Sequence, residues 1–314
     1  MTVSPELSAR FQADLFYDQR EGGLGLAVSG GPDSLALLLL TAAAGRGRFE
    51  AATVDHGLRP ESAAEAGFVA ETCARLGVPH ATLRVTVGPG NLQAEARAAR
   101  YAALSAWAQE RGLGTIATAH HADDQAETML MRLGRGSGVR GLAGIARESY
   151  PFDCGLALVR PLLAWRKAEL AGVVAAAGLT PVNDPSNENS DFERVRARQL
   201  LQQAKWLDPM ALAASAAHLS EANSVLAMVS SAEWTGQVRN DGHGLRYRPL
   251  QPAVIRQWIV ERAIHAISGR TPRGSAVAAL ERKLSEGGNG NLGGVLARVV
   301  DGEWVFEPEP PRSL

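Results

Sequence analysis

The amino-acid sequence predicts an α/β protein: a doubly wound, mostly parallel sheet followed by a smaller, mainly helical C-terminal domain. Two observations predict this fold. In the first half of the chain, short strand-like apolar runs alternate with longer helical runs, an order typical of parallel sheets. Beyond about residue 161 the strand pattern fades and helical patterns dominate. We place the boundary near Trp206, which gives domains 1–207 and 208–314.

Four short apolar or β-branched runs are expected to form the parallel strands, each followed by a segment with helical spacing. The expected strands are 24–29, 49–54, 80–87 and 115–119, and the helices after them are 33–44, 61–76, 91–111 and 123–133. Later helices are expected at 163–177, 192–205, 209–232 and 252–267, and the rest of the C-terminal part is expected to mix short strands with Gly-rich turns such as 287–294. Because ligands of doubly wound sheets bind beyond the carboxyl ends of the strands, the residues after each strand are the candidates for function.

Composition excludes several classes of protein. The chain has 314 residues, of which 46% are hydrophobic and 21% are charged, with a net charge of −1, so it is neither disordered throughout nor a polycation. Two cysteines, Cys73 and Cys154, are too few for a disulfide framework or a four-thiolate zinc site. The longest apolar run, 34–44, is too short to span a bilayer. We therefore expect a cytoplasmic protein with no membrane partner.

A glycine-rich loop, SGGPDS, joins the end of the first expected strand to the start of the helix expected at 33–44. Its glycines allow the backbone to approach an anion, and the helix N-terminus offers unpaired N–H groups. It therefore predicts a phosphate site, although a tight turn with helix-capping side chains is the alternative. Asp33 either caps the helix or helps to hold Mg²⁺ on the phosphates. The loop consists of Ser29, Gly30, Gly31, Pro32, Asp33 and Ser34.

Polar residues after the second strand and on the helix expected at 91–111 are weaker candidates for a functional role. Asp55 and His56 follow the second strand, where backbone groups could bind the base of a nucleotide, with a simple turn as the alternative. Arg97 could reach a phosphate, although an isolated arginine on a helix is more often solvent-exposed.

The densest group of polar residues is AHHADDQAET, which follows the fourth strand and begins a helix. His120, Asp124 and Glu127 are spaced so that they lie on neighbouring faces of a helix. Three interpretations stay open: a metal site, carboxylates that bind a cationic amine while His120 places a phosphate or moves a proton, and a helix N-terminus enriched in acids.

Three basic segments are candidate contacts for phosphates. Residues 132–147 are rich in Arg and Gly and are expected to form a mobile loop near the substrate, or a simple linker. Arg194, Arg196 and Arg198 cannot share one helical face, so at least one is expected to face solvent. Residues 239–283 hold nine basic and three acidic residues with interleaved aromatic residues, which favours a nucleic-acid face as much as an ordinary surface.

Together these motifs resemble a known family. The SGGPDS loop resembles the PP-loop of the N-type ATP pyrophosphatases, which several activities share. The further motifs resemble the tRNA(Ile)-lysidine synthase family over about residues 20–205. They are VDHGLR at 54–59, AEARAARY at 94–101, TAHHADDQAETMLMRLGRGSGVRGLAGI at 118–145, RPLL at 160–163 and DPSN at 184–187.

The resemblance implies a ligase that uses ATP and Mg²⁺ to adenylate C2 of the wobble cytidine in a CAU anticodon, which an amine of free lysine then attacks. The implied partners are tRNA(Ile) and free L-lysine, and a homodimer is left open because the sequence does not determine oligomeric state. The loop 29–34 would hold pyrophosphate, with Asp33 placing Mg²⁺ and Arg97 steadying phosphates. Asp124 and Glu127 would hold lysine, and His120 would lie near the α-phosphate.

Two departures from the family pattern concern the arginines and the C-terminal domain. The family often has Arg-Asn-x-x-Arg where this chain has RVRAR, so Arg194, Arg196 and Arg198 are all candidates to close the site. The C-terminal domain is shorter than in members that carry two such domains.

Three alternative functions stay open: a tRNA thiolase, which needs suitably placed cysteines, a non-catalytic RNA-binding adaptor, and a metal hydrolase built on 120–124.

Overall fold

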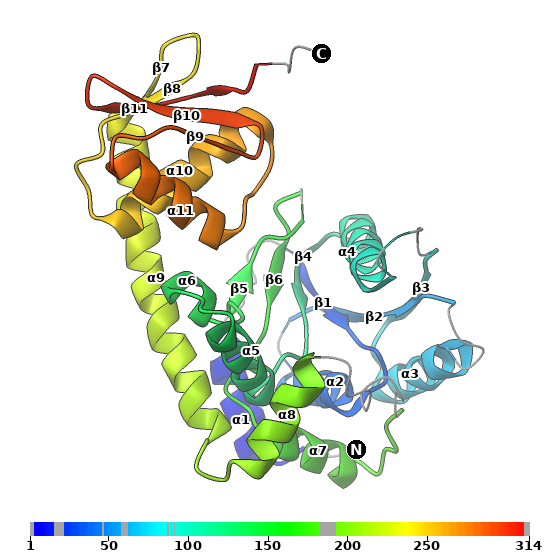
Figure 1. Ribbon diagram of the computed structural model, residues 1–314. Helices are drawn as coiled ribbons and strands as arrows, with labels where there is room; N and C mark the ends of the chain where they lie inside the picture. The colour runs from blue at the N-terminus through cyan, green and yellow to red at the C-terminus, as the bar shows by residue number, and fades with distance from the viewer. Residues whose placement is uncertain are drawn as a thin grey trace. The chain divides into compact units, whose positions relative to one another are not determined.

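The computed structural model describes residues 3–15, 22–45, 47–57, 62–86, 88, 90, 92–152, 154–182 and 193–310 (Figure 1). The chain forms two compact units, Met1–Ser220 and Glu221–Leu314. The division between these units falls within helix α9 (Pro209–Gln237). The domain boundary at 207/208 stays a prediction.

The first unit is built on a six-stranded sheet with the strand order β3-β2-β1-β4-β6-β5. All neighbouring strands are parallel except β5, which runs antiparallel to β6. The predicted α/β class and its mostly parallel sheet are therefore confirmed. The strands are β1 (Gly23–Ala27), β2 (Phe49–Asp55), β3 (His80–Arg84), β4 (Leu113–Ala117), β5 (Glu148–Ser149) and β6 (Ala157–Val159).

Helices cover both faces of this sheet. Residues of α1, α2, α3 and α7 pack with Leu24 and Leu26 on one face, and residues of α4 pack with Ile116 on the other. Helix α2 is apolar all round because it lies between the sheet and two other helices, and Leu35 to Leu40 are almost fully buried. The helices are α1 (Pro5–Asp14), α2 (Pro32–Ala44), α3 (Ser62–Leu76), α4 (Leu92–Glu110), α5 (Ala122–Gly134), α6 (Val139–Leu142), α7 (Lys167–Ala176) and α8 (Glu193–Gln203).

The second unit combines helices with an antiparallel sheet of order β7-β8-β11-β10-β9. Its core packs Trp304 and Phe306 of the sheet against Ile259 and Ile264 of α10. The unit is thus less helical than the sequence pattern indicates. Its elements are β7 (Val238–Asn240), β8 (Leu245–Tyr247), α10 (Ala253–Ser268), α11 (Gly274–Ser285), β9 (Gly290–Leu292), β10 (Val295–Val300) and β11 (Glu303–Pro308).

Among the residues that the structure describes, none of the helices combines the length and the apolar character that a bilayer span requires.

Candidate active site

The site lies where the sheet changes its direction of winding. Strands β1 and β4 are neighbours, although α2, β2, α3, β3 and α4 separate them in the chain. Ligands of open α/β sheets bind at such a point, beyond the carboxyl ends of the strands. The loop 29–34 leaves β1 here, and the segment 118–121 leaves β4 here.

Gly30 gives the loop after β1 its shape. Its φ angle is +85°, a left-handed conformation that residues with a side chain rarely adopt. A Cβ atom at this position would also lie 3.3 Å from methyl groups of Val69 and Val182. A larger residue would therefore distort the loop that leads into α2.

The first turn of α2 is arranged to receive an anion. The backbone N–H of Ser29 donates to Oγ of Ser34 at 3.1 Å, and that hydroxyl donates to the carbonyl of Gly31 at 3.0 Å. The helix begins at Pro32 and no side chain caps its N-terminus. The remaining N–H groups of the turn, together with the helix dipole, favour a phosphate.

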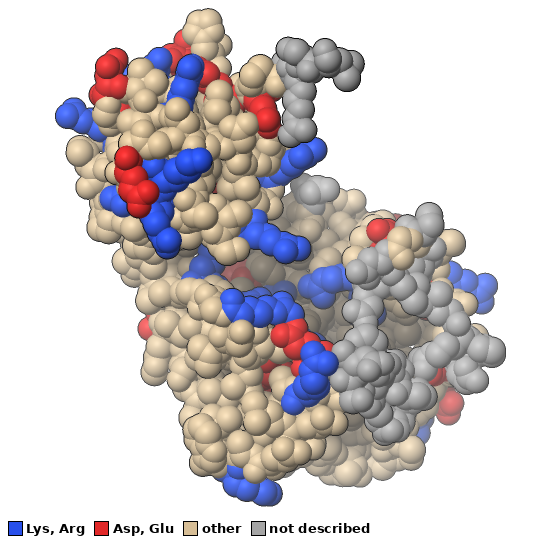
Figure 2. Space-filling view, in the orientation of Figure 1, with Lys and Arg blue, Asp and Glu red and all other residues tan. Residues whose placement is uncertain are grey.

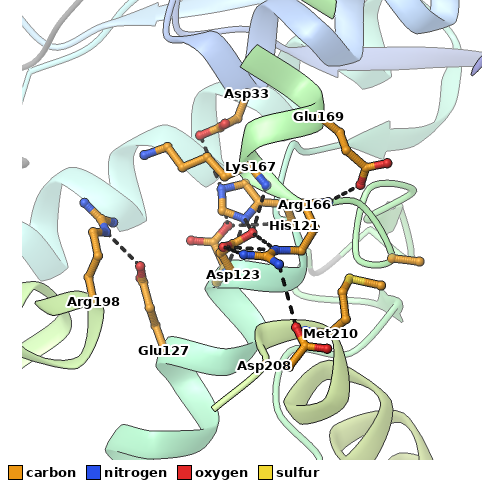
Figure 3. A network of polar contacts seen from close by, with 12 residues as sticks. Asp33, His121, Asp123, Glu127, Arg166, Lys167, Glu169, Arg198, Asp208 and Met210 are labelled. Atoms are coloured by element: carbon orange, nitrogen blue, oxygen red, sulfur yellow. Dashed lines mark hydrogen bonds and ion pairs between the residues drawn. The ribbon is translucent and has the colours of Figure 1, made fainter. Parts of the chain in front are cut away.

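Asp33 projects from this turn toward the segment that follows β4 (Figure 3). Its Oδ2 lies 3.5 Å from Nε2 of His121, whose side chain is only 4% exposed. Its other oxygen, Oδ1, is buried and has no hydrogen-bond partner among the residues that the structure describes. A buried carboxylate oxygen without a partner is costly, and a cation on the phosphates would satisfy it.

His121 begins helix α5. Its Nδ1 accepts the N–H of Asp124 at 3.3 Å, and the carboxylate of Asp124 accepts the N–H of His121 at 3.1 Å, so the two residues form a capping box. Burial opposes protonation of His121, but Asp33 and the carboxylates of Asp124 and Asp123 outweigh burial and raise its pKa. Sequence reasoning gave this residue no individual role.

His120 is the neutral member of the histidine pair. It precedes α5 rather than lying on it, which corrects the expected helical spacing from Asp124. Its Nδ1 is 3.0 Å from Oγ1 of Thr118. Burial lowers the pKa of His120 to about 4, and nearby guanidinium groups add to this effect while Asp124 opposes it. Those guanidinium groups belong to Arg160, Arg194 and Arg97.

The carboxylates of Asp124 and Glu127 lie beside two arginines of α8. Nε of Arg198 donates to Oε1 of Glu127 at 2.8 Å, and Nε of Arg194 is 3.6 Å from Oε2 of Glu127. Nη1 of Arg194 is also 4.0 Å from Oδ1 of Asp124. The structure therefore brings together four of the predicted residues. The third candidate arginine, Arg196, is exposed, as expected from its place on another helical face.

Asp123 contacts the start of α7, whereas Asp124 contacts His121 and α8. It accepts hydrogen bonds from the guanidinium of Arg166, at 3.1 to 3.3 Å, and from the backbone N–H of Lys167 at 2.8 Å (Figure 3). Burial raises its pKa, but these hydrogen bonds outweigh it and the pKa is lowered. Asp123 thus links the start of α5 to the start of α7.

Asp55 and His56 follow β2 as expected. The carboxylate of Asp55 accepts the N–H of Gly57 at 2.9 Å, and this bond, with one from Ser62, lowers the pKa of Asp55. The carboxylate therefore shapes a turn. Burial lowers the pKa of His56, whose Nδ1 is buried without a partner. Their contact with a nucleotide base stays a prediction, and residues 58–61 lie outside the described residues.

Arg97 is exposed on α4. Its guanidinium donates to the hydroxyl of Tyr101 at 2.6 Å and lies over the ring of the same residue. Its contact with phosphates stays a prediction. The DPSN motif at 184–187 lies outside the described residues.

The segment after α5 is held to α5 by hydrogen bonds, and its mobility near a substrate stays a prediction. Arg132 donates to the carbonyls of Gly141 and Gly144 at 2.6 and 2.8 Å. The side-chain amide of Gln125 exchanges two hydrogen bonds with the backbone of Ile145. A Cβ atom on Gly144 would collide with Gln125, so this glycine serves close packing.

The basic segment of the second unit is partly neutralised by acids of the same unit (Figure 2). Arg239 pairs with Glu303, and Arg256 pairs with Glu281. Tyr247, expected among the interleaved aromatic residues of a nucleic-acid face, is 1% exposed and belongs to the core. The exposed basic residues of this segment are Arg239, Arg248, Arg262, Arg270, Arg273, Arg282 and Lys283.

A metal site made by the protein alone is not favoured. Within the described ranges, no group of three or more His, Cys, Asp or Glu side chains is arranged to hold a metal ion. Asp33 supplies one free carboxylate oxygen, which fits Mg²⁺ because this ion commonly takes one or two carboxylates together with substrate phosphates.

Comparisons with known proteins agree with this geometry. Residues 5–205 match the PP-loop domain family. The chain is 45% identical over 307 residues to the tRNA(Ile)-lysidine synthase of Novosphingobium aromaticivorans, covering 96% of this chain and 94% of that protein. It is 43% identical over 299 residues to the tRNA(Ile)-lysidine synthase of Zymomonas mobilis, covering 93% and 90%.

A solved structure supports the fold alone. The U34-tRNA thiolase NcsA from Methanococcus maripaludis aligns with a TM-score of 0.56 at 17% identity, covering 70% of this chain and 78% of the thiolase. At that identity the likeness concerns the architecture.

Proposed function

Because this chain belongs to the tRNA(Ile)-lysidine synthase family, whose members are ligases that use ATP and act on tRNA, we propose its full reaction. It joins free L-lysine to C2 of the wobble cytidine of tRNA(Ile) with a CAU anticodon. The cytidine is first adenylated and pyrophosphate leaves, and the lysine amine then attacks C2 and AMP leaves. The product changes the identity of the tRNA from methionine to isoleucine.

One observation carries the proposal: a glycine-rich loop at a helix N-terminus and a pair of carboxylates follow two neighbouring strands of the sheet. The loop 29–34 follows β1, and Asp124 and Glu127 begin the helix that follows β4. The first can hold the pyrophosphate end of ATP, and the second can hold an ammonium group. A reaction that joins an amine to an adenylated base needs both.

The first step would use the turn of α2 and Asp33. The N–H groups of this turn would receive the leaving pyrophosphate. The free Oδ1 of Asp33 would hold Mg²⁺, which neutralises charge on the phosphates when it is bound. His120 is neutral at physiological pH because its pKa is about 4, so it would contact the α-phosphate as a hydrogen-bonding group and not as a cation.

The second step would use the carboxylates of α5. Glu127 is 2% exposed and already pairs with a guanidinium, so its surroundings suit a positive group. Glu127 and Asp124 would together bind the positive charge of lysine, while an uncharged amine of lysine is presented to C2. Arg198 would keep its hydrogen bond to Oε1 of Glu127, and Arg194, which lies 3.6 Å from Oε2, would be displaced by lysine and free to close on phosphate groups.

Sulfur transfer is the competing reaction within this fold, and the cysteines do not favour it. The sequence holds two cysteines, Cys73 and Cys154. Cys73 is fully buried on α3, and burial raises its pKa to about 11, which disfavours a reactive thiolate. Cys154 is exposed.

The test of the proposal is transfer of radiolabelled lysine. The purified chain is incubated with ATP, Mg²⁺, labelled L-lysine and a tRNA(Ile) transcript with a CAU anticodon, with a tRNA(Met) transcript as the control. Label on tRNA(Ile) alone is expected. ATP consumption that depends on tRNA but leaves no lysine label would overturn the choice of nucleophile.

A further inference from the structure

His121 contacts both halves of the candidate site at once. It is 4% exposed, and its ring lies between the phosphate-binding loop and the carboxylates of α5 (Figure 3). Nε2 is 3.5 Å from Oδ2 of Asp33 and 3.6 Å from Oδ2 of Asp124. On the other side of the ring, Nδ1 accepts the N–H of Asp124 at 3.3 Å.

These contacts determine where the ring proton lies. A nitrogen that accepts a backbone N–H carries no proton, so the proton of a neutral imidazole must be on Nε2. Nε2 therefore donates toward the carboxylates, of which that of Asp33 is the nearer. His121 in this way fixes one oxygen of Asp33 and leaves Oδ1, the buried oxygen without a partner, for a ligand.

The residue type supports a role beyond capping. Ser, Thr, Asp and Asn are the preferred residues at the start of a helix, and each caps with one short side chain. Imidazole adds a second polar atom on the far side of the ring, which here reaches Asp33 on another element. Capping of α5 alone would not require Nε2.

We propose that His121 is a positioning residue: by holding Oδ2 of Asp33, it orients Oδ1 toward the magnesium ion on the ATP phosphates, and by its contact with Asp124 it fixes the lysine-binding carboxylates relative to that ion. The proposal rests on the proposed function for the identity of its ligands. Residues that orient a metal ligand in this manner commonly change metal affinity by about tenfold to a hundredfold.

Two substitutions separate the two bonds of the ring. In His121→Asn, the amide oxygen can replace Nδ1 as the cap of Asp124 but nothing reaches Asp33. In His121→Gln, the amide nitrogen can replace Nε2 near Asp33 but the cap is lost. His80→Asn is the matched control, because His80 contacts Thr53 on β2. Circular dichroism and thermal unfolding establish that each variant is folded.

The readout is calorimetric binding of ATP with and without Mg²⁺. For His121→Asn we expect the Kd of MgATP to rise by about tenfold or more, while the Kd of ATP without Mg²⁺ changes by less than about threefold. For His121→Gln we expect MgATP affinity within about threefold of wild type but a lower Tm, because the cap is lost. His80→Asn should bind MgATP as wild type does.

The opposite pattern would overturn the proposal. If His121→Asn binds MgATP as tightly as wild type while His121→Gln does not, His121 is only a helix cap. If His121→Asn does not fold, the inference depends on His121→Gln, whose loss of MgATP affinity by tenfold would contradict it. The wild-type lysine-transfer assay is independent of this comparison, so failure of the proposed function and failure of this inference give different results.

Discussion

Nε of Arg198 donates to Oε1 of Glu127 across 2.8 Å and thereby joins α8 to the buried carboxylate of α5. The other oxygen of Glu127 is buried without a hydrogen bond, although Nε of Arg194 lies 3.6 Å from it. A buried carboxylate with one oxygen paired and one free is poised to accept a second cation. We assign that place to the ammonium group of lysine.

Glu127→Gln should therefore impair the use of lysine. The substitution keeps the shape of the side chain but removes the charge, and loss of a charge-assisted hydrogen bond costs about 1.5–3 kcal/mol. The KM for lysine should rise by about tenfold to a hundredfold, while tRNA-dependent formation of the adenylate changes little. Steady-state lysine transfer and pyrophosphate release measure the two steps. Glu169→Gln, at the start of α7, is the matched control, and equal loss of both steps in Glu127→Gln would contradict the assignment.

Asp33→Asn should act on the other step. The amide cannot hold Mg²⁺ as a carboxylate does, so pyrophosphate release should fall by about a hundredfold or more. Binding of tRNA, measured by gel shift, should stay within about threefold of wild type, because Asp33 is one side chain at the phosphate site. A variant that releases pyrophosphate at the normal rate would exclude Asp33 as the magnesium ligand.

His120 should stay neutral throughout the physiological range. Burial is the main cause of its lowered pKa, which is about 4, so its protonated form gains population only below about that pH. Nuclear magnetic resonance of labelled histidines, with His120→Asn to assign the signal, should show no titration of this ring between about pH 6 and about pH 8. A midpoint near the ordinary histidine value of about 6.5 would show that His120 is charged during turnover.

Asp123→Asn should destabilise the first unit in a pH-dependent manner. The pKa of Asp123 is lower in the folded protein than its ordinary value, so its ionised form stabilises the fold above that value. At neutral pH the substitution should lower the free energy of unfolding, measured in urea, by about 1–3 kcal/mol. The loss should fall toward the lower end of this range because water reaches Arg166 and screens the ion pair. The difference from wild type should stay constant down to about pH 4 and shrink as pH falls through the lowered pKa.

The control for Asp123→Asn is Asp208→Asn. Asp208 also faces Arg166, at 3.7 Å, but its side chain is 58% exposed. The change should stay within about 0.5 kcal/mol of wild type at neutral pH. A larger loss in Asp208→Asn than in Asp123→Asn would contradict the view that Asp123 forms the main link between α5 and α7.

Four strands of the first unit could be predicted because β1, β2 and β4 are mostly buried apolar runs and β3 alternates polar and apolar residues, and because a helix follows each of them. Strands β5 and β6 were not predicted, since two or three residues are too few to show a pattern. Short strands are expected in the second unit, but their pairing into one sheet could not be predicted, because β8 has three residues and pairs with β11, more than fifty residues later. Helix α7 begins at Lys167 and not at residue 163, because Arg166 is its N-cap residue.

The candidate site could be predicted in outline and not in detail. Neighbouring strand ends bring Asp33, Asp124 and Glu127 to one edge, which spacing alone indicates. The sequence could not show that Asp123 turns toward Arg166 or that His121 turns toward Asp33, because these directions depend on α5 beginning at Ala122. The spacing of polar residues along the sequence does not show which residue of another helix or loop each side chain contacts.

The central claim is that lysine becomes bonded to the wobble cytidine, and the most direct measurement is the mass of that nucleoside. The tRNA(Ile) transcript is incubated with wild-type protein, ATP, Mg²⁺ and lysine, then digested and examined by mass spectrometry, with Asp33→Asn as the control. The account predicts that wild type adds one lysine, less one water, to the wobble cytidine, and that Asp33→Asn leaves it unchanged. A wobble cytidine that stays unmodified with wild type, or that gains sulfur, would contradict the account.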